Sequence, residues 1–188
     1  LENERSLQLC DRMGFKSISN LKTLIFSRFF PKVSSTVFRI KEHEKREVLT
    51  HIRNFYSTYS CTSFENIFKN DAYFVLKKEG RIVAGVQAHK VNWVMEEIPD
   101  FIGKVIKYIV PHTPLLNRLI NPKHYHFLAF EGLFFENEIY TEELLESVCA
   151  ELNVYSGIIW ADEKSHLYLI LKKCSLGFLN KLNDDVSA

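Results

Sequence analysis

The hydrophobic and polar positions between residues 36 and 94 follow two different periods. Ala72–Lys77 and Ile82–Val94 alternate residue by residue on either side of Lys78-Glu79-Gly80-Arg81, which predicts a β-hairpin with its tight turn at Gly80. His43–Tyr59 instead carries its apolar residues at helical spacing along one face. The shorter stretch Thr36–Lys41 alternates again and predicts a strand before that helix.

The pattern changes in the second half of the chain. His126–Glu136 is apolar or aromatic at most positions, which is typical of a central strand covered on both sides. Thr141–Leu152 follows a helical pattern with Thr141 as its expected N-cap, and Tyr155–Ala161 predicts another strand. This order predicts an α/β (α+β) fold: a mixed, mostly antiparallel, twisted sheet of about six or seven strands with helices on both faces.

The two ends of the chain carry a near-repeat. Asn3–Phe15 and Asp162–Phe178 each begin with Asn or Asp, have Ser three residues later, continue as a short amphipathic helix and end in Gly-Phe. Glycine ends such a helix because the backbone must turn through positive φ. Internal similarity of this kind predicts two related units, or parts of them, in one chain.

Both copies resemble the late helix of the GNAT N-acetyltransferase superfamily, which reads N-x-x-[SA]-x-x-x-Y-x-x-x-G-F. The order of hairpin, central strand, helix and strand is similar to that family over residues 37–183. The resemblance implies two domains. Residues 1–33 would be the C-terminal tail of a preceding unit, with a strand over Ile18–Phe30, and residues 34–188 a GNAT-like domain. The polar stretch Phe29–Ser35 is the expected boundary, and we expect the chain to be a fragment of a longer protein.

A long connection separates the hairpin from the central strand. Ile98–Pro122 carries two apolar helical stripes, interrupted by Pro111 and Pro114. In the GNAT plan these strands are joined by a short turn, so this segment is a helical insertion at about residues 98–122. The pattern favours an extra helical pair packed on the sheet. A substrate lid, a dimer surface and peripheral membrane contact are the alternatives.

Composition narrows the classes of protein. With 188 residues and 46% hydrophobic content, the chain is long enough for a packed globular domain. A net charge of +1 gives no global field for nucleic acid. The 4 cysteines show no CxxC spacing, three of them lie in apolar helical patterns as expected buried thiols, and a reduced, cytoplasmic setting is favoured. No apolar run is long enough for a transmembrane segment.

The resemblance implies a site for acyl transfer. In this family a Glu on the fourth strand or its neighbour often acts as general base, which corresponds to Glu131 here; an ion pair or an edge exposed by strand twist is the alternative explanation. The family's acid is a Tyr four residues before the helix-ending Gly, a place that Lys173 holds in the second copy. Tyr168, earlier on that helix, is the candidate acid, with core packing as the alternative.

The resemblance also implies a site for acetyl-CoA. Pantetheine would lie along Leu133, Phe134 and Phe135, and the pyrophosphate at the start of the next helix. The residues there are Asn137, Ile139, Tyr140 and Thr141. The family has [QR]-x-x-G-x-[GA] at this loop, whereas this chain has no Gly and four carboxylates, Glu136, Glu138, Glu142 and Glu143. Because like charges repel phosphate, we expect weak or absent acetyl-CoA binding.

Two functions follow from these features. One is acetyl-CoA-dependent N-acyl transfer to an amine of a small molecule or peptide, with a homodimer or a preceding N-terminal unit as possible partner. The other is a catalytically degenerate GNAT-like domain with a structural, dimerising or ligand-sensing role. His124 and His126 share a strand face but lack an evident third ligand, so we expect no metal.

Overall fold

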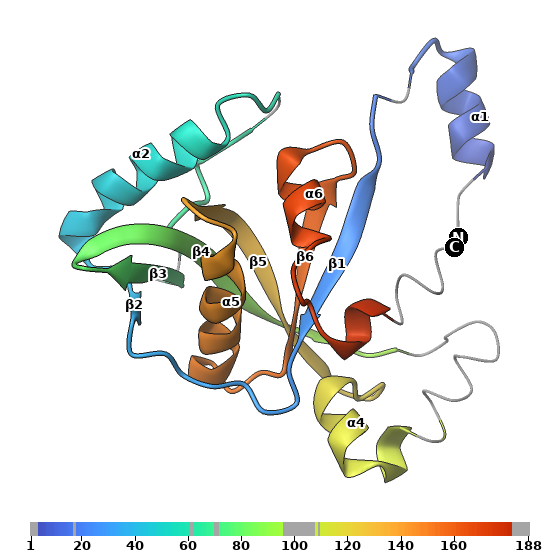
Figure 1. Ribbon diagram of the computed structural model, residues 1–188. Coiled ribbons are helices and arrows are strands. Elements are labelled where there is room, and N and C mark those ends of the chain that lie inside the picture. Colours follow the sequence, from blue (N-terminus) through green and yellow to red (C-terminus); the bar gives the residue numbers. More distant parts are fainter. Residues whose placement is uncertain are drawn as a thin grey trace.

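The computed structural model contains one six-stranded sheet with the strand order β1-β6-β5-β4-β3-β2 (Figure 1). It describes residues 4–16, 18–60, 62–69, 72–95, 108 and 110–181. The strands are β1 Leu21–Ser27, β2 Val37–Arg39, β3 Tyr73–Lys78, β4 Arg81–Trp93, β5 Tyr125–Phe135 and β6 Ser156–Asp162. Neighbours pair antiparallel except β5 and β6, which are parallel. The mixed, mostly antiparallel sheet predicted from the sequence is confirmed.

Helices cover both faces of the sheet (Figure 1). The helices with described bounds are α1 Glu4–Arg12, η1 Glu42–Glu44, α2 Lys45–Phe55, η3 Val110–His112, α4 Pro114–Leu119, α5 Ile139–Glu151 and α6 His166–Leu171. Helices α5 and α6 share a buried cluster with Phe74 and Leu76 of β3, whereas α2 packs on Tyr73 and Val75 of the same strand. Because side chains alternate along a strand, these two sets face opposite ways, and the prediction of helices on both faces is confirmed.

The predicted hairpin is present at its predicted position. Strands β3 and β4 pair with Lys78 opposite Arg81, and Gly80 turns the chain at φ +80°. The helix predicted over His43–Tyr59 is shorter: η1 and α2 together end at Phe55, and a turn follows. That turn redirects Tyr56 and Tyr59 toward the sheet, where both pack against the core.

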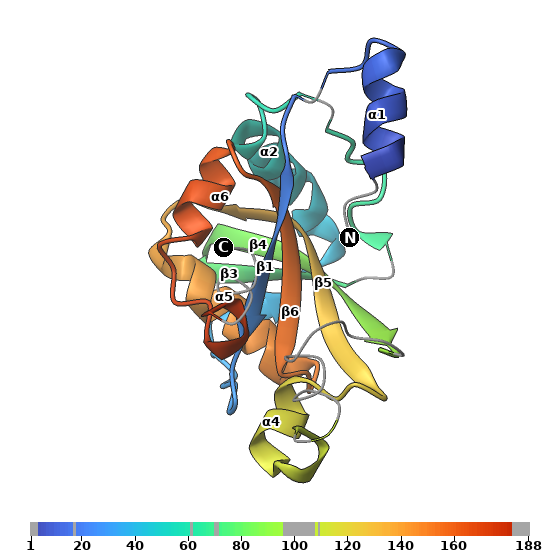
Figure 2. The same cartoon turned by 90° about the vertical axis from the view of Figure 1, so that its right-hand side faces the viewer.

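The apolar run Leu21–Phe30 predicts a strand that pairs either with the main sheet or with another chain, and the structure shows that it joins the main sheet. Strand β1 pairs antiparallel with β6 along its whole length, from Leu21 opposite Asp162 to Ser27 opposite Ser156. Figure 2 shows β1, β6 and β5 side by side, with α1 apart from the sheet. Cys10 on α1 is exposed, whereas Cys149 is buried and Cys174 half-buried. The expectation of a buried thiol is therefore wrong for Cys10, because α1 does not pack on the core.

Two details of helix capping differ from the prediction. Helix α5 begins at Ile139, so Thr141 lies inside its first turn and is not the N-cap. Helix α6 is capped by Ser165, whose hydroxyl oxygen accepts the backbone N–H of Tyr168 at 3.1 Å. Gly14 closes α1 at φ +83°, as expected for a helix-ending glycine, whereas the same expectation is wrong for Gly177, because α6 ends at Leu171 and Gly177, at φ +104°, lies six residues later.

The end of the predicted insertion is helical and contains the expected break. Helix η3 ends at His112, and α4 starts at Pro114, where proline is tolerated because the first N–H of a helix has no internal partner. Val110 and Leu119 are buried. The stripe predicted over residues 101–110 lies mostly outside the described residues. No helix within the described part of the chain has the length and apolar character to span a membrane.

Candidate ligand cleft between two diverging strands

The central feature of the site is that β5 and β6 pair at only two positions. Leu128 lies opposite Gly157 and Ala129 opposite Ile158, after which the two parallel strands separate. A Cβ atom at Gly157 would lie 2.1 Å from the Phe130 ring, so the ring occupies space directly over the β6 backbone. Phe130 thus fills the point where pairing stops, and glycine is required opposite it.

A cleft of about 320 Å³ opens where the strands have separated, and we call it the β5–β6 cleft. Its walls come from α2, the loop after α2, β5, β6 and α6. Its lining is mainly apolar and aromatic: Ile52, Tyr56, Phe64, Ile67, Phe130, Leu133, Ile159, Trp160 and Leu167, with Thr62, Ser63, Asn66, Glu131 and Gly132. An apolar concave lining with a few polar groups is typical of small-molecule sites, and this volume lies at the small end of their range.

Glu131, the candidate base, lies at the exposed rim of this cleft. Its side chain is 50% exposed, its carboxylate accepts a weak hydrogen bond from Gln87 at 3.4 Å, and His89 Nε2 lies 3.9 Å away. Both neighbours come from β4, directly across the pairing of β4 with β5. The carboxylate is therefore accessible to solvent and has polar neighbours. This agrees with the alternative explanation, in which Glu131 forms an ion pair or lies at an exposed edge of the strand. A catalytic role for Glu131 stays a prediction.

Tyr168, the candidate acid, lies on α6 and packs against the core; it does not line the cleft. Tyr56 lines it instead and donates its hydroxyl to the Leu133 carbonyl at 2.7 Å. Burial, with a smaller contribution from Tyr59, raises the pKa of Tyr56, so the phenol keeps its proton. Sequence reasoning missed Tyr56 because it falls on the apolar stripe of a helix, where aromatic residues usually belong to the core.

The residues expected along the pantetheine do not share one surface. Only Leu133 lines the cleft, because Phe134 stacks on His51 at 5.3 Å and Phe135 packs on Phe55 at 5.0 Å. The carbonyls of Gly132 and Leu133 already accept hydrogen bonds from Tyr73 and Tyr56. A pantetheine chain that bonded to these carbonyls would have to displace two buried phenols.

The start of α5, the expected pyrophosphate site, is closed by its own groups. The N–H of Ile139 donates to the Asn137 side chain at 3.1 Å, that of Tyr140 to the Asn137 carbonyl, and that of Thr141 to the Glu138 carbonyl. These are the donors that a helix N-terminus offers to a phosphate. Since each has a partner, the first turn of α5 presents no free backbone cradle at these three positions.

The acidic residues of α5 bind the segment that follows β1. Glu142 pairs with Arg28 at 3.2 Å and accepts the Ser175 N–H at 2.6 Å. One turn later, Glu146 lies 3.4 Å from Arg28 and accepts the Lys32 N–H at 3.1 Å. Together these carboxylates hold residues 28–32 against the helix.

Glu143 fixes the next part of the same segment. It accepts the hydroxyls of Ser34 and Thr36 at 2.7 and 2.6 Å, and Lys78 at 3.0 Å. Burial alone would raise the pKa of Glu143, but the bonds from Thr36, Ser34 and Lys78 lower it overall. We call the contacts of Glu142, Glu143 and Glu146 with residues 28–36 the acidic clamp. These glutamates therefore stabilise the fold at the start of α5, where the phosphates of a coenzyme would require positive charge.

Comparison with protein-family models and with curated protein sequences found no match for this chain. Within the described residues, no three His, Cys, Asp or Glu side chains are grouped so that they could hold a metal ion. The site must therefore be interpreted from its own geometry.

Proposed function

We propose that this chain is a GNAT-like unit of an N-acyltransferase that binds a small amine or acyl ligand in the β5–β6 cleft without anchoring coenzyme A phosphates at α5. The observation that carries the proposal is the separation of β5 from β6 after two paired positions, which leaves an apolar cleft bounded by Tyr56 and Glu131. A sheet that opens in this way exposes strand backbone and side chains to a ligand at one defined place.

The same geometry argues against a coenzyme bound in the usual manner of the resembled family. The backbone donors at the start of α5 have internal partners, and the adjacent carboxylates form the acidic clamp. A pyrophosphate there would meet acceptors and negative charge where it needs donors. We infer that the role of this unit is ligand binding, and that phosphates add nothing to its affinity.

A pair of thioesters tests this proposal. Acetyl-CoA and S-acetylpantetheine share the reactive end but only the first carries phosphates. Binding is followed through the fluorescence of Trp160 in a Trp93→Phe background, which leaves one tryptophan, at the cleft. We expect the two affinities to agree within about threefold. If acetyl-CoA binds more tightly by about a hundredfold or more, the inference that α5 offers no phosphate site is wrong. If neither thioester binds, the proposal that the β5–β6 cleft binds an acyl ligand is wrong.

The position of Glu131 favours a second candidate function, acyl transfer within this unit. Glu131 would remove a proton from a substrate ammonium, the amine nitrogen would attack the thioester carbonyl, and the C–S bond would break. Tyr56 would pass its proton to the leaving thiolate and regain one from the nitrogen, which loses its second proton as the amide forms. The observation that favours it is that Glu131 and Tyr56 line the same cleft from different elements.

Substitution separates this second function from ligand binding. Glu131→Gln should lower turnover by about a hundredfold while leaving the affinity for acetylpantetheine unchanged. Glu138 is an exposed glutamate that does not line the cleft, so Glu138→Gln is the matched control and should keep full activity. A fully active Glu131→Gln protein would remove catalysis by this residue and leave the ligand-binding proposal standing.

A further inference from the structure

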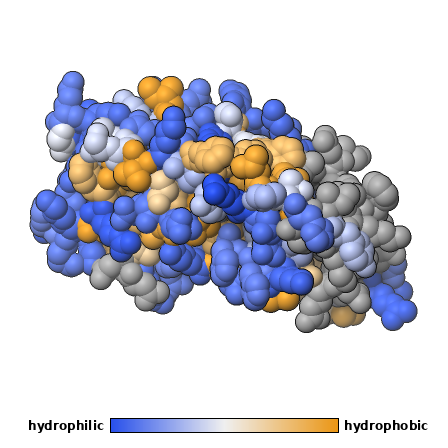
Figure 3. All heavy atoms as spheres, turned by 90° about the horizontal axis from the view of Figure 1, so that it is seen from below, coloured by the Kyte–Doolittle hydropathy of each residue, from blue (hydrophilic) through white to orange (hydrophobic). Residues whose placement is uncertain are grey.

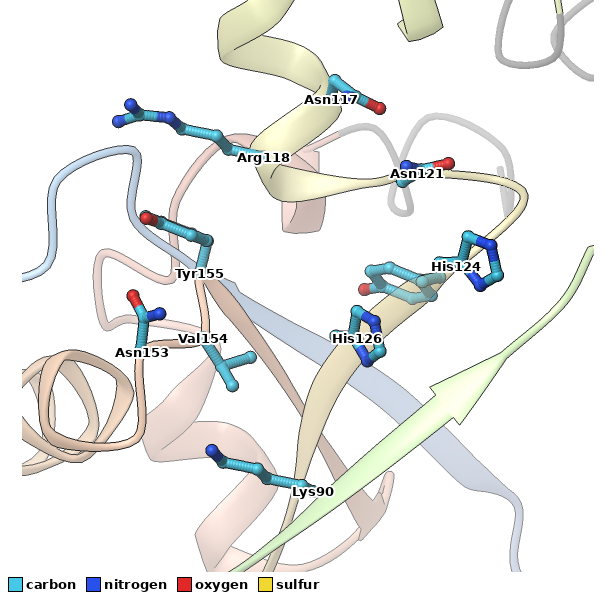
Figure 4. Close-up of a pocket in the computed structure, with 10 residues that line it drawn as sticks. Lys90, Asn117, Arg118, Asn121, His124, His126, Asn153, Val154 and Tyr155 are labelled. Carbon is cyan, nitrogen blue, oxygen red and sulfur yellow. The ribbon is translucent and has the colours of Figure 1, made fainter.

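A second cavity, lined by two formal cations and two histidines, lies at the other end of β5. A pocket of about 620 Å³ opens between α4, the start of β5, β4 and the turn that leads into β6. Lys90, Arg118, His124 and His126 line it, and none of its lining residues is Asp or Glu. In Figure 4 the Arg118 guanidinium extends from α4 on the side of Tyr155, whereas His124 and His126 lie on the side of β5, with Lys90 on β4 below them. We call this hollow the Lys90–Arg118 pocket.

Neither formal cation of the pocket is neutralised by the described part of the protein. Within the described residues, no carboxylate forms an ion pair with Lys90 or with Arg118. Arg118 is held by aromatic rings instead, with its guanidinium 5.8 Å from the Phe30 ring centre and 5.7 Å from that of Tyr155. A cation that has no carboxylate partner among the described residues can pair with an anionic group of a ligand.

Amide side chains supply neutral hydrogen-bonding groups around the same hollow. Asn121 uses its side-chain oxygen to accept the Lys123 N–H at 3.0 Å, which leaves its NH₂ group available to donate. The side-chain oxygen of Asn117 is buried and has no partner within the described residues. Such an oxygen is satisfied when a ligand brings a hydroxyl or amino donor.

The walls of the pocket are tied together by buried bonds. Ser156 at the start of β6 lies in hydrogen-bond contact with the Leu119 carbonyl of α4 at 3.4 Å and the Tyr125 hydroxyl of β5 at 3.2 Å. All three of these residues are buried. Because of these buried bonds, the hollow lies between elements that are held together. On the described surface at this end, apolar groups form separate clusters among hydrophilic ones (Figure 3).

We propose that the Lys90–Arg118 pocket binds the phosphate group of a small phosphate monoester of about nucleotide size. Lys90 and Arg118 meet the phosphate, His124 and His126 add donors, and the amides of Asn117 and Asn121 meet hydroxyl or amino groups of the organic part. The volume is suited to a whole metabolite, since a single phosphate ion would leave most of it empty. This site lies at the opposite end of β5 from the cleft and does not depend on the proposed function.

Calorimetry with inorganic phosphate, AMP and adenosine tests the proposal on the full chain at low salt. We expect AMP to bind with a Kd of about 1 mM or tighter, inorganic phosphate to compete with it more weakly, and adenosine to bind at least about tenfold more weakly than AMP. Equal affinity of AMP and adenosine would overturn phosphate recognition. Equal affinity of AMP and inorganic phosphate would overturn recognition of the organic part.

Variants locate the binding. Lys90→Ala and Arg118→Gln should each weaken AMP binding by about tenfold or more. Lys123→Ala removes the same charge from an exposed residue next to the pocket that does not line it, and should change the affinity by less than about twofold. Circular dichroism verifies that each variant is folded. Equal weakening in all three variants, or no binding of either phosphate compound at about 10 mM, would overturn the proposal.

Discussion

The two ends of β5 have opposite electrostatic surroundings. Beyond Phe135, at the carboxyl end, the chain enters α5, where Glu142, Glu143 and Glu146 are engaged by Arg28, Lys78 and the segment after β1. Before Tyr125, at the amino end, it meets Lys90 and Arg118, which have no carboxylate partner within the described residues. The net charge of the chain is nearly neutral, yet its charges are unevenly distributed along β5: glutamates stabilise the fold at the carboxyl end, and cations line a cavity at the amino end.

This difference teaches that a charged residue type does not by itself indicate a ligand. The glutamates of α5 are numerous but satisfied, so they stabilise the fold and offer little to a ligand. The two cations at the other end have no carboxylate partner in the described part of the chain, and they line a hollow large enough for a metabolite. The two groups of charges differ in whether each side chain has an ion-pair or hydrogen-bond partner, and only the folded structure reveals this.

Arg28→Met should give the largest effect at the acidic end. Arg28 donates to the Ser175 carbonyl at 2.7 Å, pairs with Glu142 and Glu146, and lies 4.4 Å over the Phe26 ring with 19% of its side chain exposed. Removing it leaves two partly buried carboxylates without their cation, so we expect a loss of about 2–4 kcal/mol in the free energy of unfolding. Urea denaturation measures this.

Arg39→Met is the matched control for that change. Its pair with Glu151 spans 3.8 Å and its side chain is 55% exposed, so the loss should stay below about 1 kcal/mol. Equal losses in the two variants would contradict a special role for Arg28. Phosphate binding at the Lys90–Arg118 pocket should be unchanged in both.

Gly157→Ala tests the point that divides the two regions. A methyl group there would lie 2.1 Å from the Phe130 ring, so either the ring or strand β6 must move. We expect a loss of about 1–3 kcal/mol, because overpacking a filled core forces side chains and backbone to shift. Adding Phe130→Leu should recover most of that loss. If the double variant is no more stable than Gly157→Ala, the ring does not set the separation of the strands.

Glu143→Gln should alter the pH dependence of stability. The lowered pKa of Glu143 means that its stabilisation is present above the pKa of an unfolded Glu and is lost as pH falls through the folded value. We expect the variant to lose about 1–2 kcal/mol at neutral pH and to show a shallower decline in stability under acid. Thermal melts between pH 7 and pH 3 check this. Parallel curves for both proteins would show that Glu143 is not stabilised by its bonds to Ser34 and Thr36.

Thr141→Val should give the smallest effect, and of opposite sign. The Thr141 hydroxyl is fully buried in the first turn of α5 and has no partner within the described residues. Replacing it by a methyl group of similar shape removes an unsatisfied polar atom, so stability should rise by about 0.5–1 kcal/mol. A clear loss of stability would mean that the hydroxyl is hydrogen-bonded in solution.

Most of the fold was accessible from sequence because it depends on local periodicity. Alternation and apolar runs predict the hairpin at Gly80 and the central strand, whereas they leave open whether the N-terminal strand pairs with this sheet or with another chain. The N-cap of α5 was misplaced because Asn137 supplies the cap for Ile139, a bond that the pattern of Thr141 followed by acids does not reveal. Local signals resolve elements better than their ends.

The candidate sites were less accessible because their residues come from distant segments. Glu131 was found from its interruption of an apolar strand, whereas Tyr56 was hidden within a helical stripe. The partners of the acidic clamp, such as Arg28 and Glu142, lie 114 residues apart in sequence. His124 and His126 were noticed as a pair, but Arg118 and Lys90 join them only through the arrangement of α4 and β4. The periodicity of the sequence does not predict contacts between residues from such distant segments.

Mapping the binding of AMP by two-dimensional amide NMR tests most directly the central claim that phosphate is recognised at the amino end of β5 and excluded at α5. We expect shifts that saturate together at residues 117–126 and 153–155, with residues 136–143 unaffected. Saturable shifts confined to residues 136–143 would contradict it, because they would show that the start of α5 still binds phosphate despite its carboxylates.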